Sequence, residues 1–105
     1  MSDHSELIRK IIKAIQSRGG VAFHVFSGLI KTGRFAIHGA EDGTFDVIGC
    51  YKGHFLAFDA KVGKDVLSDD QIEFMAKVRD NGGVAMAIYD AGTITGLLDS
   101  LDTER

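Results

Sequence analysis

The sequence contains no proline, a single cysteine and no long apolar run, and each absence excludes a class of protein. Without proline, low-complexity stretches or a block of like charge, the chain has neither a Pro-rich recognition segment nor the composition of a disordered tail. No stretch approaches the roughly 18 consecutive apolar residues that a membrane span requires. Residues 1–18 also lack the apolar core of a signal peptide, so we expect no membrane association.

The one cysteine, Cys50, has no partner within the chain for a disulfide bond. This suits a reducing compartment, and we expect a cytoplasmic protein. A lone cysteine in an apolar run is usually a small buried hydrophobe, so we assign Cys50 no chemistry.

A chain of 105 residues with 45% hydrophobic composition is long enough for one core and too short for two, so we expect a single domain over residues 1–105. The formal charge of −3 argues against a non-specific DNA coat, because such binding depends on Lys and Arg neutralising phosphates. It does not exclude a nuclease, since carboxylates that bind metal are neutralised when loaded and a basic patch can occupy one face.

Hydrophobic patterning predicts the first half of the fold. Apolar residues at helical spacing predict a helix over 3–18, whose basic face either touches phosphate or is simply solvated. Alternation predicts strands over 21–26 and 33–38, joined by a connection over 27–32. Two apolar runs, 44–51 and 54–61, predict a hairpin of central strands that is buried on much of both faces.

The second half is predicted to be helix, strand, helix. Ser68 to Gln71 has the Ser-x-x-Gln form of a capping box, which opens a helix that runs to about residue 80. The apolar side of that helix is predicted to be Ile72, Met75, Ala76 and Val78. A strand over 84–89, placed beside a central strand, and a short helix over 93–101 complete an α/β sandwich around a mixed sheet.

The predicted hairpin brings two carboxylates and one lysine together. Asp59 and Lys61 are two residues apart in one strand, so both project from the same face. A hairpin centred on Lys52-Gly53 sets Asp46 opposite Asp59, with Cβ atoms roughly 5 Å apart. Like charges placed opposite one another destabilise a sheet, and Asp is disfavoured in strand interiors, so the arrangement indicates a purpose beyond folding.

A divalent cation would remove this penalty. Mg²⁺ or Mn²⁺ suits such oxygen ligands and usually takes one or two carboxylates, with water and substrate phosphate in the other positions. The ion can polarise a phosphodiester while Lys61 orients the attacking water or stabilises the transition state. The alternative is that Lys61 neutralises both carboxylates in a salt-bridged cluster, and spacing alone favours neither.

Four segments resemble the PD-(D/E)XK nuclease superfamily, and their spacing is similar to its VRR-NUC branch. They are Gly-Thr-Phe-Asp-Val-Ile-Gly at 43–49, Phe-Asp-Ala-Lys at 58–61, Leu-Ser-Asp-Asp-Gln at 67–71 and Gly-Gly-Val at 82–84. The resemblance runs from the first helix to the strand after Gly83. It implies a restriction-endonuclease-like core in the order α-β-β-β-β-α-β-α and a metal-dependent endonuclease that hydrolyses DNA.

Small stand-alone members of this branch occur in phages and bacteria. The resemblance therefore implies a protein of the bacterial or phage-infected cytoplasm that acts as a homodimer on branched DNA, such as a four-way (Holliday) junction. A two-fold dimer offers two sites for two symmetric nicks, and a monomer of 105 residues has little surface with which to grip a junction.

The resemblance also implies roles for individual residues. Asp46 and Asp59 ligate the metal, the backbone carbonyl of Ala60 adds a third ligand, and Lys61 is the catalytic lysine. Where this branch usually has Glu, the chain has Asp59, which is one methylene shorter and leaves the metal distance and preference open. Phe45 stands where the family often has Pro, and this leaves strand hydrogen bonding intact.

Two further positions match the family and have a second interpretation. Gln71 matches a polar position that supports the site, or it merely completes the capping box with Ser68. Glu6 matches the acidic residue that relatives often carry on the first helix near the metal, or it is an exposed residue paired with Lys10.

The remaining charged and ring side chains are weaker candidates. The histidines, at no metal-ligand spacing, are His4, His24, His38 and His54. Isolated histidines are mostly structural, although His38 and His54 are candidate substrate contacts. The cations at loops or strand ends, which either hold phosphates or are solvated, are Lys31, Arg34, Lys52 and Lys64. The rival function is a non-catalytic nucleic-acid-binding module on the same fold, which the intact aspartate and lysine set argues against.

Overall fold

The computed structural model describes residues 2–26, 29–32, 35–39 and 41–103, and along 29–32 and 35–38 it describes the backbone only. The described elements, in chain order, are α1 (Asp3–Ser17), β1 (Val21–His24), β2 (Leu29–Thr32), β3 (Phe35–His38), β4 (Val47–Tyr51), β5 (His54–Ala60), α2 (Asp69–Asp80), β6 (Val84–Ile88) and α3 (Gly92–Thr103). The three predicted helices, the central hairpin and the strand after α2 are confirmed, with ends that differ by a few residues.

Helix α1 forms where a capping residue precedes an apolar stripe. The Ser2 hydroxyl accepts a hydrogen bond from the Ser5 backbone N–H at 3.1 Å, which satisfies one free donor of the first turn. The side chains that recur at helical spacing are buried, and they are Leu7, Ile8, Ile11 and Ile15. The chain leaves the helix through Gly19, whose φ of 87° lies in the left-handed region.

The turn between β4 and β5 sets the register of the central hairpin. Lys52 and Gly53 have φ values of 47° and 84°, as a type I′ turn requires. The antiparallel pairing that follows runs back to Val47, and continuing it by one residue sets Asp46 opposite Asp59. The register predicted from the sequence is therefore confirmed, although β4 begins at Val47 rather than at residue 44.

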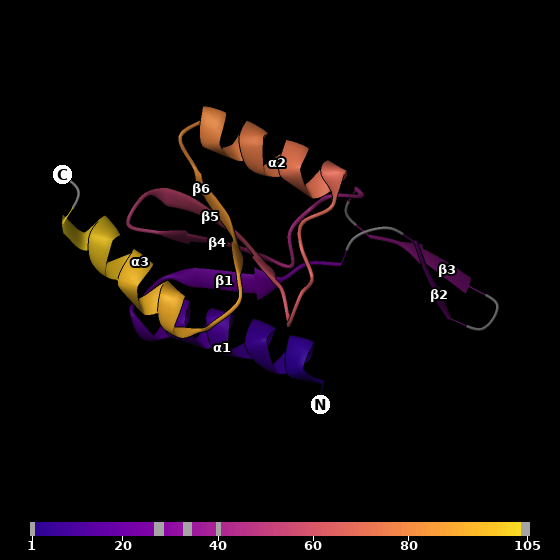
Figure 1. The fold of residues 1–105 in the computed structure, drawn as a ribbon, viewed down its shortest axis with the longest axis horizontal. Coiled ribbons are helices and arrows are strands. Elements are labelled where there is room, and N and C mark those ends of the chain that lie inside the picture. The colour runs from indigo at the N-terminus through magenta and orange to yellow at the C-terminus, as the bar shows by residue number, and fades with distance from the viewer. Residues whose placement is uncertain (1, 27–28, 33–34, 40, 104–105) are drawn as a thin grey trace.

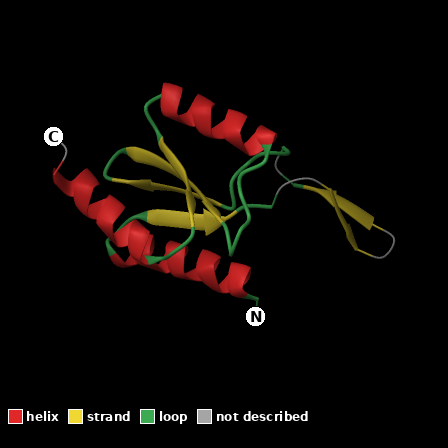
Figure 2. Ribbon diagram, viewed as in Figure 1, coloured by secondary structure: helices red, strands yellow, loops and turns green. Residues whose placement is uncertain are grey.

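The main sheet has the strand order β1-β4-β5-β6, with β5 and β6 parallel and the other neighbours antiparallel. Helices α1 and α3 cover one face and α2 covers the other (Figure 2). Strand β5 lies in the middle, and its residues 56–60 are all buried. The predicted α/β arrangement, helices around a mixed sheet, is confirmed at this level.

Strands β2 and β3 form a separate two-stranded antiparallel sheet that projects away from the main sheet (Figure 1). The predicted connection over 27–32 is wrong for residues 29–32, which are a strand, while residues 27 and 28 lie outside the described residues. Two short runs separated by Gly33-Arg34 carry the spacing of a hairpin with a two-residue loop. Within the described residues, five strands rather than the predicted four therefore precede α2.

Helix α2 meets the sheet through a side that differs from the predicted one. Its side chains in the core are Phe74, Met75 and Val78. The prediction is thus confirmed for Met75 and Val78 but wrong for Ile72, which is 46% exposed, and for Ala76, which is also exposed. Phe74 turns the helix, because its ring packs on the buried ring of Phe45 with centroids 5.2 Å apart.

Cys50 is exposed, so the prediction of a buried cysteine is wrong. It lies on β4 between Val21 of β1 and Phe55 of β5, and both of these partners are exposed as well. Burial alternates along β4, whereas the sequence predicted that this strand is buried on much of both faces. Helix α2 does not cover the part of the sheet face on which Cys50 lies. The apolar neighbours of Cys50 in the sequence do not reveal this lack of cover.

Among the helices of the described ranges, none has the length and apolar character needed to cross a membrane.

Candidate active site

The carboxylates of the two aspartates predicted to pair across the hairpin each accept a hydrogen bond from the backbone of the opposite strand segment. The backbone N–H of Asp46 donates to Asp59 Oδ1 at 3.1 Å, and the backbone N–H of Ala60 donates to Asp46 Oδ2 at 3.1 Å. Side-chain carboxylates thus take the place of strand carbonyls at this end of the ladder. This explains why β4 begins only at Val47.

Asp59 is the only buried charged side chain among the described residues, with 2% of its surface exposed. Burial raises the pKa of Asp59 above its usual range, and the negative charge of Asp46 raises this pKa further. The Lys61 ammonium acts in the opposite direction. The ionised form of Asp59 therefore costs the folded protein stability, which is the penalty expected from the sequence.

Lys61 lies between Asp59 and the first turn of α2. Its Nζ is 3.1 Å from Asp59 Oδ2 and donates a hydrogen bond to Gln71 Oε1 at 3.1 Å, and 16% of its side chain is exposed. The same Gln71 oxygen accepts the Ser68 backbone N–H at 3.0 Å, which completes the capping box. Both interpretations of Gln71 are therefore present: it caps α2 and it holds the lysine.

Helix α1 reaches the site through His4, which the sequence indicated only as a structural histidine. His4 Nε2 lies 3.1 Å from Asp46 Oδ2. A carboxylate oxygen accepts, so this contact is a hydrogen bond in the tautomer whose Nε2 carries the proton. The helical period held a signal for it: His4 precedes the buried Leu7, Ile8 and Ile11 by three, four and seven residues and so continues their stripe.

In the described part of the chain, Glu6 makes no hydrogen bond or ion pair with this group. It follows His4 by two positions, which turns its side chain about 200° around the helix. It forms an ion pair with Arg9, at 2.5 Å, rather than with the predicted Lys10. The hydrogen bond from Arg9 lowers the pKa of Glu6. The structure thus brings Asp46, Asp59, Lys61 and Gln71 together, adds His4, and leaves Glu6 in a surface pair.

Two helices contact the site through their first turns. His4 belongs to the first turn of α1 and Gln71 to that of α2, and both helices begin at the same end of the sheet (Figure 1). The N-terminal end of a helix carries partial positive charge, which favours nearby carboxylates. The two aspartates therefore lie where two positive helix ends and one lysine converge.

The donor set fits a hard divalent cation that takes few protein ligands. Asp46, Asp59 and Lys61 have a combined formal charge of −1, from two carboxylates and one ammonium. Mg²⁺ and Mn²⁺ are commonly bound through one or two carboxylates, and water and phosphate complete the shell. Within the ranges that the structure describes, no three His, Cys, Asp or Glu side chains converge as a metal-binding group.

The other predicted contacts are scattered. Lys52 lies at the opposite end of the hairpin and pairs with Asp102 at 2.8 Å, and His54 lies at that end too. Lys64 is exposed between β5 and α2. Lys31 and His38 belong to β2 and β3, whose side chains are not described, and Arg34 lies outside the described residues.

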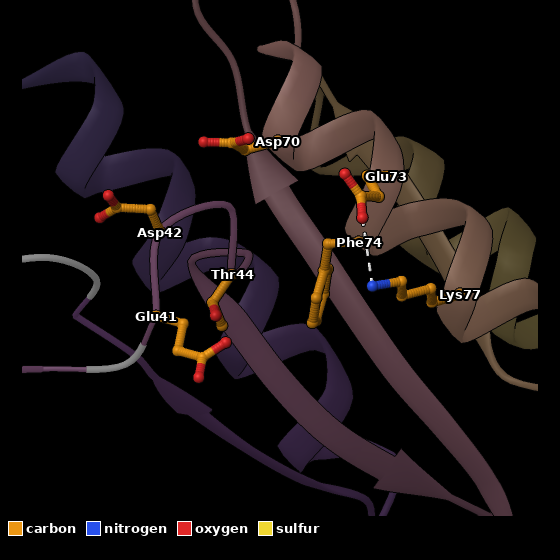
Figure 3. A pocket seen from close by; sticks show the side chains of 7 residues that line it. All are labelled: Glu41, Asp42, Thr44, Asp70, Glu73, Phe74 and Lys77. Atoms are coloured by element: carbon orange, nitrogen blue, oxygen red, sulfur yellow. Dashed lines mark ion pairs between the residues drawn. The ribbon is translucent and has the colours of Figure 1, made fainter.

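A cavity of about 590 Å³ opens between the segment before β4 and α2 (Figure 3). Its lining residues are Glu41, Asp42, Thr44, Asp70, Glu73, Phe74 and Lys77. The single lysine pairs with Glu73 at 3.2 Å, so the carboxylates dominate the field and would repel a phosphate. Asp46 and Lys61, by contrast, have 22% and 16% of their side chains exposed outside this cavity lining.

The chain matches no protein-family model and no curated protein. The geometry of the site is thus the basis for a functional proposal.

Proposed function

We propose that this chain is a metal-dependent endonuclease that hydrolyses DNA phosphodiester bonds on a restriction-endonuclease-like core of the VRR-NUC type. The observation that carries the proposal is the convergence of Asp46, Asp59 and Lys61 at one end of the β4–β5 hairpin, with Gln71 holding the lysine. A buried aspartate beside a second carboxylate destabilises the fold, and a bound cation would offset that cost.

Asp46 and Asp59 would hold Mg²⁺ or Mn²⁺, with the carbonyl of Ala60 as the third protein ligand that the family resemblance implies. When bound, the ion would polarise the phosphodiester and stabilise charge on the leaving oxygen. Asp59 is 2% exposed and the side chain of Asp46 is 22% exposed, so a cation would reach the pair from the side of Asp46.

Lys61 would supply the preoriented cation of the reaction. An ammonium has three N–H donors, and Asp59 and Gln71 engage two of them. The third can orient the attacking water or donate to a phosphate oxygen. In the hydrolysis, the water oxygen forms a bond to phosphorus and loses a proton, and the bond to the leaving sugar oxygen breaks as that oxygen gains one.

We infer branched DNA as the substrate and a homodimer as the active form. The chain exposes 6624 Å² in total. A specific DNA interface buries about 1,000–2,500 Å² of protein surface, which would be a large share of one such chain. Two copies related by a two-fold axis would divide that interface and present one cleaving site to each of two strands.

The direct test is cleavage of linear, flapped and four-way-junction DNA by the purified protein, with Mg²⁺, Mn²⁺ or a chelator, beside Lys61→Ala. We expect metal-dependent cleavage that is fastest on branched substrates and falls roughly 10²- to 10³-fold in the variant, because a preoriented donor to the transition state is lost. Light scattering on the same samples should give twice the mass of one chain.

Two outcomes would overturn the proposal. Cleavage at equal rates by both proteins would mean that Lys61 plays no part in it and that the activity comes from elsewhere. Binding of branched DNA without cleavage of any substrate, with either metal, would favour the non-catalytic module instead.

A further inference from the structure

His4 and Asp46 make the one contact that links α1 to the carboxylate pair within the described residues. His4 Nε2 lies 3.1 Å from Asp46 Oδ2, and the side chains are 48% and 22% exposed. The same Asp46 oxygen accepts the Ala60 backbone N–H at 3.1 Å. One carboxylate oxygen is thus held by two donors that come from different layers of the fold, a helix and the sheet.

We propose that His4 is a positioning residue of the active site: its Nε2–H fixes the Asp46 carboxylate in the orientation that metal binding requires. This inference rests on the proposed function. It assigns to His4 the part that α1 plays at the site, while Glu6 on the same helix pairs with Arg9.

The physical reason lies in how the carboxylate is held. The Ala60 N–H alone leaves the carboxylate some freedom to turn about its Cβ–Cγ bond, because a single hydrogen bond to Oδ2 tolerates a range of angles. A second donor from α1 removes that freedom. Hydrogen bonds to ligating carboxylates are known to tune metal affinity, and their loss typically costs about 10- to 100-fold in affinity or activity.

The position of His4 in α1 directs its side chain toward Asp46. His4 continues the stripe of Leu7, Ile8 and Ile11, which is buried against the sheet, so packing of the helix directs its side chain to the sheet end. Ser2 caps the turn that contains it. The His4 side chain is 48% exposed, and the packing of the apolar stripe that it continues is what directs it to Asp46.

The experiment compares Mn²⁺ binding by calorimetry and DNA cleavage in the full chain and three variants. His4→Ala removes the donor, His4→Gln keeps an N–H donor at nearly the position of Nε2, and Gln16→Ala changes an exposed residue on the same helix. We expect Mn²⁺ affinity to fall about tenfold in His4→Ala and to stay close to the parent value in the other two.

The rates of DNA cleavage should separate the variants in the same way as the Mn²⁺ affinities. In His4→Ala, the rate should fall at limiting Mn²⁺ and recover most of its value at saturating Mn²⁺, because only the binding of the ion is impaired. Thermal unfolding in chelator checks that each variant is folded, and a purely structural role for His4 would lower that stability without weakening Mn²⁺ binding.

A failure of the proposed role of His4 can be distinguished from a failure of the proposed function. If the parent protein binds Mn²⁺ and cleaves DNA while His4→Ala binds the ion equally well, the role of His4 is overturned and the nuclease proposal stands. Equal weakening by His4→Ala and His4→Gln would also overturn it, since the hydrogen bond would not be the cause. If the parent neither binds Mn²⁺ nor cleaves, the proposed function fails and His4 loses its role with it.

Discussion

Each end of the hairpin strand β4 carries a cluster of acidic and basic side chains. The two clusters differ in burial and in the direction in which the pKa of their central aspartate is shifted. At the first end Asp59 is almost fully buried and faces Asp46, and its pKa is raised, chiefly by burial. At the second end Asp102 accepts a hydrogen bond from the Tyr51 hydroxyl at 2.6 Å and pairs with Lys52 at 2.8 Å. Its pKa is lowered, chiefly by its hydrogen bond with Lys52.

The second cluster has the geometry of a stabilising ion-pair network. Asp102 has more donors than it has oxygens, since Arg18 adds a further bond at 3.1 Å, and its side chain is 31% exposed. The group ties the end of α3 to the sheet and to α1. The first cluster has two acids for one lysine and is buried, so its geometry is costly by itself. This contrast favours a role in ligand binding for the first end of β4 and a structural role for the second.

The same substitution at each end should separate the two roles most strongly. Asp46→Asn should reduce metal-dependent cleavage by at least about 10²-fold, because the charge that holds the cation is lost and metal catalysis supplies several kcal/mol. Asp102→Asn should keep parent cleavage and unfold at a lower temperature. Rates on junction DNA and thermal melts of both variants measure this, and comparable cleavage by the two would remove the distinction.

Substitutions at Ser68 and Gln71 separate the contribution of the capping box from that of the lysine contact. Ser68→Ala removes a cap and should cost about 1 kcal/mol of stability, with cleavage unchanged. Gln71→Ala also frees the Lys61 ammonium, and we expect cleavage to slow about tenfold, as for other partners that orient a catalytic group. Denaturant unfolding and single-turnover cleavage give the two numbers, and a matching loss of activity in Ser68→Ala would assign the effect to α2 as a whole.

Asp59→Glu tests how closely the buried end of the site fits its acid. The longer side chain is the acid usual in the VRR-NUC branch that the sequence resembles, and under the proposed function we expect cleavage to be retained with an altered ratio of Mn²⁺ to Mg²⁺ activity. The measurement is cleavage across a titration of each ion. Complete loss with both ions, in a variant that still melts cooperatively, would show that the packing around Asp59 admits only the shorter acid.

The smallest expected effect is a difference in the sign of the pH dependence of stability. The raised pKa of Asp59 lies above the ordinary value of 3.8, so between these values the folded state binds more protons and stability falls as pH rises. The lowered pKa of Asp102 gives the reverse: its stabilisation is present above 3.8 and is lost as pH falls through the folded value.

Thermal melts in chelator, from about pH 3 to pH 7, would resolve these two slopes. Asp59→Asn should remove the decline on the alkaline side of 3.8, and Asp102→Asn should remove the loss on its acidic side. Identical pH profiles for Asp59→Asn and the parent would mean that burial of this carboxylate carries no cost.

Much of the fold and the centre of the site could be predicted because they depend on local chemistry. The helix α1 follows from its apolar residues at helical spacing, and α2 follows from its capping box. The pairing of Asp46 with Asp59 follows from counting outward from the Lys52-Gly53 turn, because a two-residue turn leaves one register. Spacing in a strand then adds Lys61 to the same face.

The predictions that failed depend on which element covers which surface. Cys50 is exposed because α2 covers only part of its face of the sheet, and Ile72 is exposed because Phe74 turns that helix onto Phe45. The strand β2 pairs with β3 outside the main sheet, although it has the same length as β1, which belongs to the main sheet. Periodicity describes one element at a time and cannot show these neighbours.

Residue type and spacing were therefore enough to place two acids and a lysine together at one end of a hairpin, since backbone geometry within a turn and a strand is local. The packed structure alone decided what surrounds them. Burial of Asp59, which raises its pKa, and the approach of His4 depend on how helices from distant parts of the chain pack on the sheet. No property of the hairpin itself could have supplied that information.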